Sequence, residues 1–377
     1  MYDFVVVGVG PPGARFARQA AEAGRKVLAL ESGEIGEPLA CSGHVSTDVW
    51  AYTGDGAREE LLQNEIYGAR FHVGGPSRNG ATAGNGSNGD ERDTYPFYKR
   101  DPVSNVIDRV GLDRHLAALA RDAEADVRDG HTVTEVREHH DRVEVTAKGP
   151  EGTETFEAKM VAGCDGPRSR VREALSLPDP DEFLHGVLAF SEEDDDGDFV
   201  DVHLTAPRFF AWRIPRGHAG VEYGLAAPPG VQVNKHFTDL VDGYEIDVSH
   251  RCSGTIPVGP PDRVTSRRGF LIGDAAAQTK PFTGGGILYG MTCADHAARE
   301  IDPDRPTTLS AYERAWRNDL EREIQLGHWL RRAYSLPEPI QRAGLRALSG
   351  EIGVHMDRPT SVFSKEHLKA TFGGSRG

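Results

Sequence analysis

Residues 3–13 read DFVVVGVGPPG, and this stretch decides the fold. An apolar run that glycine interrupts is typical of a buried parallel strand. Residues 12–23 continue with alanines at helical spacing up to Gly24, which is placed as a C-terminal cap, and residues 26–30 return as a second strand before Glu31. The first 31 residues therefore predict a complete βαβ unit.

The glycines of this turn lie where dinucleotide binding needs them. Gly8 permits the tight turn, Gly10 lets the backbone approach a pyrophosphate, and Gly13 allows close packing of helix on strand. The N-terminus of the helix supplies free N–H groups and the positive end of the helix dipole. Glu31 follows at the distance from which an acid reaches a ribose hydroxyl. This pattern predicts a dinucleotide site without separating FAD from NAD, and an ordinary tight turn is the alternative.

The composition indicates a folded, acidic protein with more than one core. The chain has 377 residues, of which 38% are hydrophobic, and this length favours two connected domains. A net charge of -15 leaves no basic stripe for phosphates, so we expect no nucleic-acid partner. The four cysteines form no CxxC pair, and no metal site is expected. Without a long apolar run, we expect a cytoplasmic protein whose membrane contact, if any, is peripheral at the inner face.

Two later stretches read as returns to the same sheet. Residues 160–172, MVAGCDGPRSRVR, contain an Asp-Gly pair, and residues 269–298 contain a strand that leads into Gly273-Asp274 and a glycine-rich turn. Asp274 can accept a hydrogen bond from a ribityl chain, and the glycines at 284–286 allow the backbone to approach a flavin ring. An N-capping aspartate and a plain turn are the alternatives. Two such loops around one ligand favour FAD.

These motifs resemble the geranylgeranyl reductase family of flavoproteins, within the FAD superfamily built like p-hydroxybenzoate hydroxylase. EPLACSGHVS at 37–46 is similar to the family's Cys-containing loop, and PRFFAWRIP at 207–215 to its PxxYxWxFP signature, with Phe210 and Ile214 in place of the usual Tyr and Phe. The resemblance covers roughly residues 1–300. The cofactor-binding residues expected from the patterns and the resemblance are Gly8, Gly10, Pro12, Gly13, Glu31, Arg100, Asp165, Gly273, Asp274, Pro281, Gly284, Gly285 and Gly286.

The resemblance implies an FAD enzyme that saturates isolated double bonds of geranylgeranyl chains in archaeal-type ether phospholipids. NADPH or a ferredoxin-type protein would supply the electrons. Cys41 or His44 could donate the accompanying proton, although a buried small residue and a solvated loop are the alternatives. Phe210 and Trp212 would either line a prenyl pocket or belong to the core. An aromatic hydroxylase, or a flavin- or lipid-binding protein without turnover, are the alternative functions.

The expected fold is α/β, and α+β overall, with a discontinuous Rossmann-like FAD-binding domain, an antiparallel-sheet substrate domain and a helical C-terminal region. Within the helical region, residues 329–334 (WLRRAY) could touch a membrane surface or pack on the FAD domain. The expected limits are 1–70, 98–173 and 255–305 for FAD binding, 71–97 for a flexible loop and the substrate-domain edge, 174–254 for the substrate domain and 306–377 for the helices.

Overall fold

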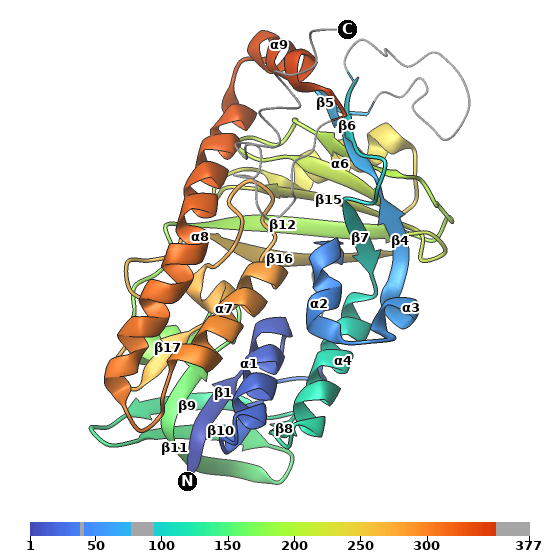
Figure 1. Ribbon diagram of the computed structural model, residues 1–377. Coiled ribbons are helices and arrows are strands. Elements are labelled where there is room, and N and C mark those ends of the chain that lie inside the picture. Colours follow the sequence, from blue (N-terminus) through green and yellow to red (C-terminus); the bar gives the residue numbers. More distant parts are fainter. Residues whose placement is uncertain (38–40, 77–93, 352–377) are drawn as a thin grey trace, which may run out of the picture.

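The computed structural model describes residues 1–37, 41–76 and 94–351, so most of the loop expected at 71–97 lies outside the described residues. Its strands form a first sheet of seven strands, a second sheet of eight and a third of three (Figure 1). Helices α1, α4, α7 and α8 lie around the first sheet, and α6 lies on the second.

The first sheet runs in the order β8-β2-β1-β11-β10-β9, and β17 also pairs with β11. β1 lies parallel to β2 on one side and to β11 on the other, while β17 is parallel to β11. The discontinuous α/β domain expected from the sequence is thereby confirmed. The strands are β1 (Tyr2–Val7), β2 (Val27–Leu30), β8 (Asp126–Arg128), β9 (Thr132–Glu138), β10 (Val143–Gly149), β11 (Gly152–Gly163) and β17 (Gly269–Leu271).

Helix α1 (Pro11–Glu22) is the centre of the helical layer on this sheet, because it contacts both α4 (Arg109–Asp122) and α7 (Ile287–Glu300). Ala14, Ala17 and Ala20 are buried and Ala21 is partly buried, as the helical spacing predicts. Beneath it, the rings of Phe4, Phe16 and Phe270 pack edge to face with centroids 5.2 to 6.2 Å apart. This arrangement joins strands from the beginning and the end of the domain into one core.

The second sheet runs in the order β16-β12-β15-β14-β13-β5-β6-β18. Its pairings are antiparallel except for β5 with β13 and β6 with β18. Helix α6 (Val233–Tyr244) covers one face, and the other face packs with residues of the third sheet. The strands are β5 (Gly68–His72), β6 (Thr94–Tyr98), β12 (Glu182–Ser191), β13 (Phe199–His203), β14 (Ala211–Pro215), β15 (Val221–Ala227), β16 (His250–Val258) and β18 (Gly350–Glu351).

The third sheet lies between the two large ones in Figure 1 and consists of β3 (His44–Ser46), β7 (Ser104–Ile107) and β4 (Leu62–Ile66). Strand β7 leads directly into α4 of the first sheet's helical layer, and β4 is followed after one residue by β5 of the second sheet. Short helices accompany it: η1 (Thr47–Val49), α2 (Trp50–Thr53) and α3 (Ala57–Leu61).

Helix α8 (Leu309–Arg332) extends along one side of the molecule and is followed by η5 (Ala333–Ser335) and α9 (Glu338–Leu348). Tyr312 and Trp316 of α8 are fully buried in the core of the first sheet. Sheet membership differs from the expected limits, because β5 already begins at residue 68 and β16 continues the second sheet to residue 258. In addition, β18 (Gly350–Glu351), within the region expected to be helical, pairs with β6 of the second sheet.

Candidate cofactor and substrate site

The turn after β1 is packed so closely that glycine is required at two of its positions. A Cβ atom at Gly13 would lie 2.0 Å from the carbonyl oxygen of Gly8, and one at Gly8 would lie 2.3 Å from the carbonyl oxygen of Cys164. Gly8 also has a φ of 94°, which side chains disfavour. Gly10 differs, since a Cβ there would meet no protein atom within 4 Å. The backbone at Gly10 is therefore open to an approaching ligand.

The open side of this turn suits an anion. Helix α1 begins at Pro11 without a side-chain cap and without an acidic residue in its first turn. Pro11 and Pro12 carry no N–H, so the first N–H that the helix offers to a ligand is that of Gly13, and the helix dipole favours negative charge there. Glu31 lies beside the turn, where its Oε2 accepts a hydrogen bond from the N–H of Val9 at 2.7 Å. This oxygen keeps a second lone pair for a ribose hydroxyl. The group of residues thus fits the pyrophosphate and ribose of a dinucleotide.

The second glycine-rich segment touches the first, as the pairing of two loops around one ligand requires. A Cβ at Gly273 would lie 2.7 Å from Cγ of Pro12, and one at Gly290 would lie 2.6 Å from the same atom. Pro12 thus packs against both η3 (Gly273–Ala276) and the first turn of α7. Gly286, just before α7, lets the carboxyl group of Asp274 approach, because a Cβ there would lie 2.6 Å from Oδ1.

Asp274 and Arg109 form the charged part of the site. Burial raises the pKa of Asp274 to about 6, and the nearby positive charge of Arg109 opposes that rise. Arg109 is only 7% exposed and pairs with Asp113 at 2.5 Å, one helical turn further along α4. A half-buried carboxyl that bonds no described side chain suits a ligand's hydroxyl groups.

Arg109 was missed by sequence reasoning, which assigned the corresponding role to Arg100. The side chain of Arg100 is 87% exposed, follows β6 of the second sheet and lies 3.4 Å from Glu351. The structure therefore does not bring Arg100 to the glycine loops. The sequence feature that could have pointed to Arg109 is its i,i+4 spacing from Asp113. Both residues lie on the face of α4 that carries Leu112 and Leu116, so the sequence already places a charge pair on an apolar face.

Asp165 and Pro281 make contacts within the protein next to the glycine-rich segments. Asp165 follows the strand β11, and its carboxylate accepts hydrogen bonds from Ser169 Oγ at 2.6 Å and from the N–H of Arg170 at 2.7 Å. Ser169 is the N-cap of helix α5 (Arg170–Ala174), so Asp165 holds the cap in place. The main chain at Asp165 lies against Gly8, so this arrangement also shapes the first glycine turn. Pro281 packs on Gly327 of α8. Contact of either residue with the cofactor stays a prediction.

Cys41 and His44 lie where the loop after β2 meets the other elements. The Cys41 thiol lies close enough to the Arg109 guanidinium for an electrostatic interaction between them. His44 begins β3, and its Nε2 lies 2.7 Å from Ser104 Oγ on the paired strand β7. Cys41 is thus in direct contact with the charged part of the site, whereas one ring nitrogen of His44 is already engaged by β7.

The aromatic strand forms an apolar wall opposite the glycine-rich turn. Phe209 is fully buried, Phe210 is 8% exposed and Trp212 is half-buried within the same cluster. A Cβ at Gly284 would lie 3.6 Å from Phe209 and 3.2 Å from Ile256 of β16. The turn expected beside a flavin ring therefore borders this wall. We define the wall by its apolar side chains on that face of the second sheet: Phe209, Phe210, Trp212, Ile214 and Ile256.

Phe210 stands where the family signature usually has a tyrosine, and a tyrosine from another part of the chain, Tyr334, packs against it. Tyr334, after α8, packs edge to face on Phe210 with centroids 5.5 Å apart, and its hydroxyl donates to the carbonyl of Phe282 at 2.9 Å. This hydroxyl links the wall to the segment that carries the glycine-rich turn.

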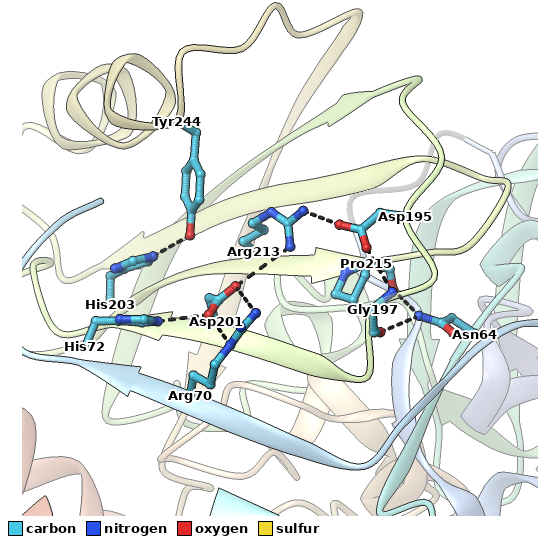
Figure 2. A network of polar contacts seen from close by, with 10 residues as sticks. All are labelled: Asn64, Arg70, His72, Asp195, Gly197, Asp201, His203, Arg213, Pro215 and Tyr244. Carbon is cyan, nitrogen blue, oxygen red and sulfur yellow. Dashed lines mark hydrogen bonds and ion pairs between the residues drawn. The ribbon is translucent and has the colours of Figure 1, made fainter. Parts of the chain in front are cut away.

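The other face of the second sheet, beneath α6, carries a polar network that sequence reasoning also missed (Figure 2). Asp201 is 6% exposed and accepts from Arg70 at 3.1 Å, and it lies 2.9 Å from Nε2 of His72. His203, two residues along β13, lies 2.6 Å from the Tyr244 hydroxyl of α6. Side chains two residues apart on a strand share a face, so Asp201 and His203 in FVDVHL were the available signal.

Comparisons with known proteins agree with this geometry. A protein-family profile described as an FAD binding domain matches residues 56–202. The digeranylgeranylglycerophospholipid reductase of Methanothrix thermoacetophila is 30% identical over 85% of this chain and 84% of its own length. Digeranylgeranylglycerophospholipid reductase 2 of Methanothermobacter thermautotrophicus is 28% identical over 86% of this chain and 85% of its own.

Solved structures share the fold. A geranylgeranyl bacteriochlorophyll reductase-like protein from Thermoplasma acidophilum superimposes with a TM-score of 0.79 at 22% identity, covering 99% of this chain and 98% of that one. The p-nitrophenol 4-monooxygenase of Pseudomonas putida superimposes with a TM-score of 0.70 at 19% identity, covering 100% and 99%.

Proposed function

Because the chain belongs to the family of the digeranylgeranylglycerophospholipid reductases, we propose that it is an FAD-dependent oxidoreductase that saturates isolated double bonds in geranylgeranyl chains of archaeal-type ether phospholipids. The observation that carries this function is the closeness of Gly284 to Phe209 and Ile256, to which an added Cβ would be in van der Waals range, so that the glycine-rich turn borders an apolar wall. A long alkyl chain can lie along such a wall beside the flavin-binding turn.

FAD, when bound, supplies the hydride for this reduction. The protein supplies position: Gly10 and the start of α1 receive the pyrophosphate, while Glu31 and Asp274 accept hydrogen bonds from the sugar portions. Arg109 adds a positive charge beside Asp274. The wall keeps water away from the alkene, so that the reducing equivalents are not lost to solvent.

The second hydrogen of the product arrives as a proton, and Cys41 is the better placed of the two candidate donors. Its thiol lies beside the positive charge of Arg109, in the charged part of the site. His44 is the alternative, held by Ser104 through one ring nitrogen.

The function is tested by anaerobic incubation of the reduced enzyme with a geranylgeranyl ether lipid. Each saturated bond adds about two mass units to the product, because a hydride and a proton are added to it. Supplying NADPH or a reduced ferredoxin in place of chemical reduction then identifies the electron donor. A hydroxylase would consume oxygen with an aromatic substrate, and a binding protein would leave the lipid mass unchanged.

A truncation at Trp212 tests whether the wall binds substrate. We expect Trp212→Ala to keep its FAD and to yield a product set with fewer saturated bonds, because the half-buried ring borders the chain without closing the core. Phe209→Ala is the matched control, since loss of a fully buried ring should cost about 3 to 5 kcal/mol of unfolding free energy. Thermal melting measures stability, bound-flavin absorbance measures FAD content, and mass spectrometry measures the product set. An unfolded Trp212→Ala, or an unchanged product set, would contradict this role.

Peripheral contact with a membrane is proposed for the end of α8 and for α9. Within the described residues no helix is long and apolar enough to cross a bilayer. Yet Trp329 is 68% exposed, and Ile340 and Leu348 of α9 are 54% and 62% exposed. Arg332 lies over the Trp329 ring at 4.6 Å, a combination that suits an anionic lipid surface. Tyr334, expected with this group, instead packs on Phe210.

Vesicle binding checks this contact. Replacing Trp329 or Ile340 with serine should lower partitioning onto anionic vesicles by about tenfold each, because each buries an apolar side chain in the lipid interface. Tyr98→Ser is the control, since Tyr98 is an exposed aromatic residue on the second sheet, outside this group. Sedimentation with vesicles measures the effect, and equal partitioning of all variants would place the contact elsewhere.

A further inference from the structure

Glu222 is a fully buried acid on the face of the second sheet that carries the apolar wall. It is 0% exposed and lies on β15, where its neighbours Val221 and Tyr223 point to the α6 side. Across the sheet it is in register with Ile214 of the wall. Its Oε1 accepts a hydrogen bond from Trp212 Nε1 at 2.8 Å. Its Oε2 accepts no hydrogen bond from any described residue.

The nearest cation compensates this acid only weakly. Arg216 Nη1 lies 4.0 Å from Glu222 Oε2, while Nε and Nη2 of the same guanidinium donate to Gln63 Oε1 at 3.2 and 3.0 Å. The guanidinium also lies over the Phe190 ring at 4.8 Å. Burial therefore raises the pKa of Glu222 to about 7, against the smaller opposing effects of the Trp212 hydrogen bond and the Arg216 charge.

The Trp212 ring is fixed between this acid and a glycine. A Cβ at Gly224 would lie 2.2 Å from the indole, so the ring lies directly across the backbone of β15. Phe210 contacts the indole edge to face, with centroids 5.6 Å apart. Gly224 and Phe210 permit the ring to lie there, and the bond from Nε1 to Glu222 is the directional contact that selects its orientation.

We propose that Glu222 is a positioning residue that holds the Trp212 indole flat across Gly224 and thereby sets the shape of the prenyl-binding wall. This inference rests on the proposed function. An indole that rotates away from Gly224 would narrow the space beside the wall, so Glu222 would determine how far along the chain double bonds can reach the flavin-binding turn.

Ionisation of Glu222 makes lipid binding at the wall dependent on pH. Arg216 and Cys252 are the titratable or charged groups that interact electrostatically with Glu222. Cys41 interacts in the same way with Cys252. Above neutral pH, a carboxylate charge with one unbonded oxygen stands within an apolar surface, which disfavours an alkyl chain beside it. We therefore expect KM for the lipid to rise as pH increases through about 7, the pKa of Glu222.

Three variants separate positioning from proton donation. Glu222→Gln keeps an acceptor for the indole N–H and should remove the pH dependence of KM. Glu222→Leu removes the acceptor and should raise KM at least fivefold at every pH, with a changed product set. Trp212→Phe keeps a ring but lacks the N–H that bonds Glu222, so the product set should change as in Glu222→Leu, while KM should still depend on pH because the acid remains. Glu192→Gln, at an exposed acid on the same domain, is the control.

Several results would overturn the inference. A kcat of Glu222→Gln reduced by orders of magnitude would make Glu222 a proton donor, and an unchanged product set in Glu222→Leu would make it structural only. Difference fluorescence between wild type and Trp212→Phe tests the contact without substrate, and should change with a midpoint near pH 7 that Glu222→Gln abolishes. A pH-independent indole signal overturns the positioning role. A wild type that shows this signal but reduces no prenyl lipid overturns the proposed function instead.

Discussion

Replacing Gly13 with alanine should give a protein that no longer retains FAD. The added Cβ would stand 2.0 Å from the Gly8 carbonyl oxygen, a contact with rigid backbone that only a shift of α1 against β1 can relieve. That shift displaces the N–H of Gly13 and the positive end of the α1 dipole from the proposed position of the pyrophosphate. We expect FAD affinity to fall by on the order of 100-fold or more, since overpacking of this kind costs several kcal/mol.

Gly10→Ala separates the loss of ligand space from the loss of packing that Gly13→Ala causes. Nothing in the described protein lies within 4 Å of the added Cβ, so thermal stability of the apoprotein should stay at the wild-type value. FAD affinity should nevertheless fall, because the methyl group occupies the space of the ligand. Gly344→Ala, also in open space but on α9, is the control for both. Flavin released on denaturation and apoprotein melting measure the two effects, and full FAD content in Gly13→Ala would refute the packing argument.

Asp201→Ala should be the most destabilising substitution beneath α6. The carboxylate is buried and pairs with Arg70, with His72 and, at 3.7 Å, with Arg213, which also pairs with Asp195, so its removal takes three charged contacts from the network at once. Breaking a buried ion pair from one side costs about 3 to 5 kcal/mol of unfolding free energy. Asp194→Ala is the matched control, because its pair with His218 is exposed and should contribute little. Chemical denaturation measures both, and equal midpoints would contradict the prediction.

An acid titration of the wild type examines the same network. Burial, and secondarily the charge of His72, lowers the pKa of His203 to about 4. The unfolded chain, with an ordinary histidine pKa near 6.5, binds this proton first, so stability should fall as pH decreases from about 6.5 to 4. Burial alone would raise the pKa of Asp201, but the hydrogen bond from His72 and the charge of Arg70 lower it, so its contribution is lost only in stronger acid. A melting temperature that stays constant from pH 7 to 4 would contradict this assignment.

The first glycine turn was predictable because its geometry is local. An apolar run, three glycines at fixed spacing and an acid at the end of the next strand specify β1, α1 and β2 through steric limits on neighbouring backbone. The later return of β11 and β17 to the same sheet could also be expected, since short apolar strands followed by Asp-Gly or Gly-Asp end at the same edge. The aromatic signature likewise placed Phe210 and Trp212 together.

The residues that only the tertiary structure decided are those whose partners lie far away in the chain. Arg109 reaches Asp274 across 165 positions, whereas Arg100, nine positions earlier, points to solvent. Glu222 reads as an ordinary polar residue of an alternating strand, and nothing local shows that Trp212 of the adjacent strand will bond it. By itself the sequence determined the cofactor fold, because backbone sterics act between neighbours. Burial and charge pairing act between surfaces that meet only after the chain has folded, so the buried acid of the wall and the arginine of the cofactor site were settled by the packing of separate sheets.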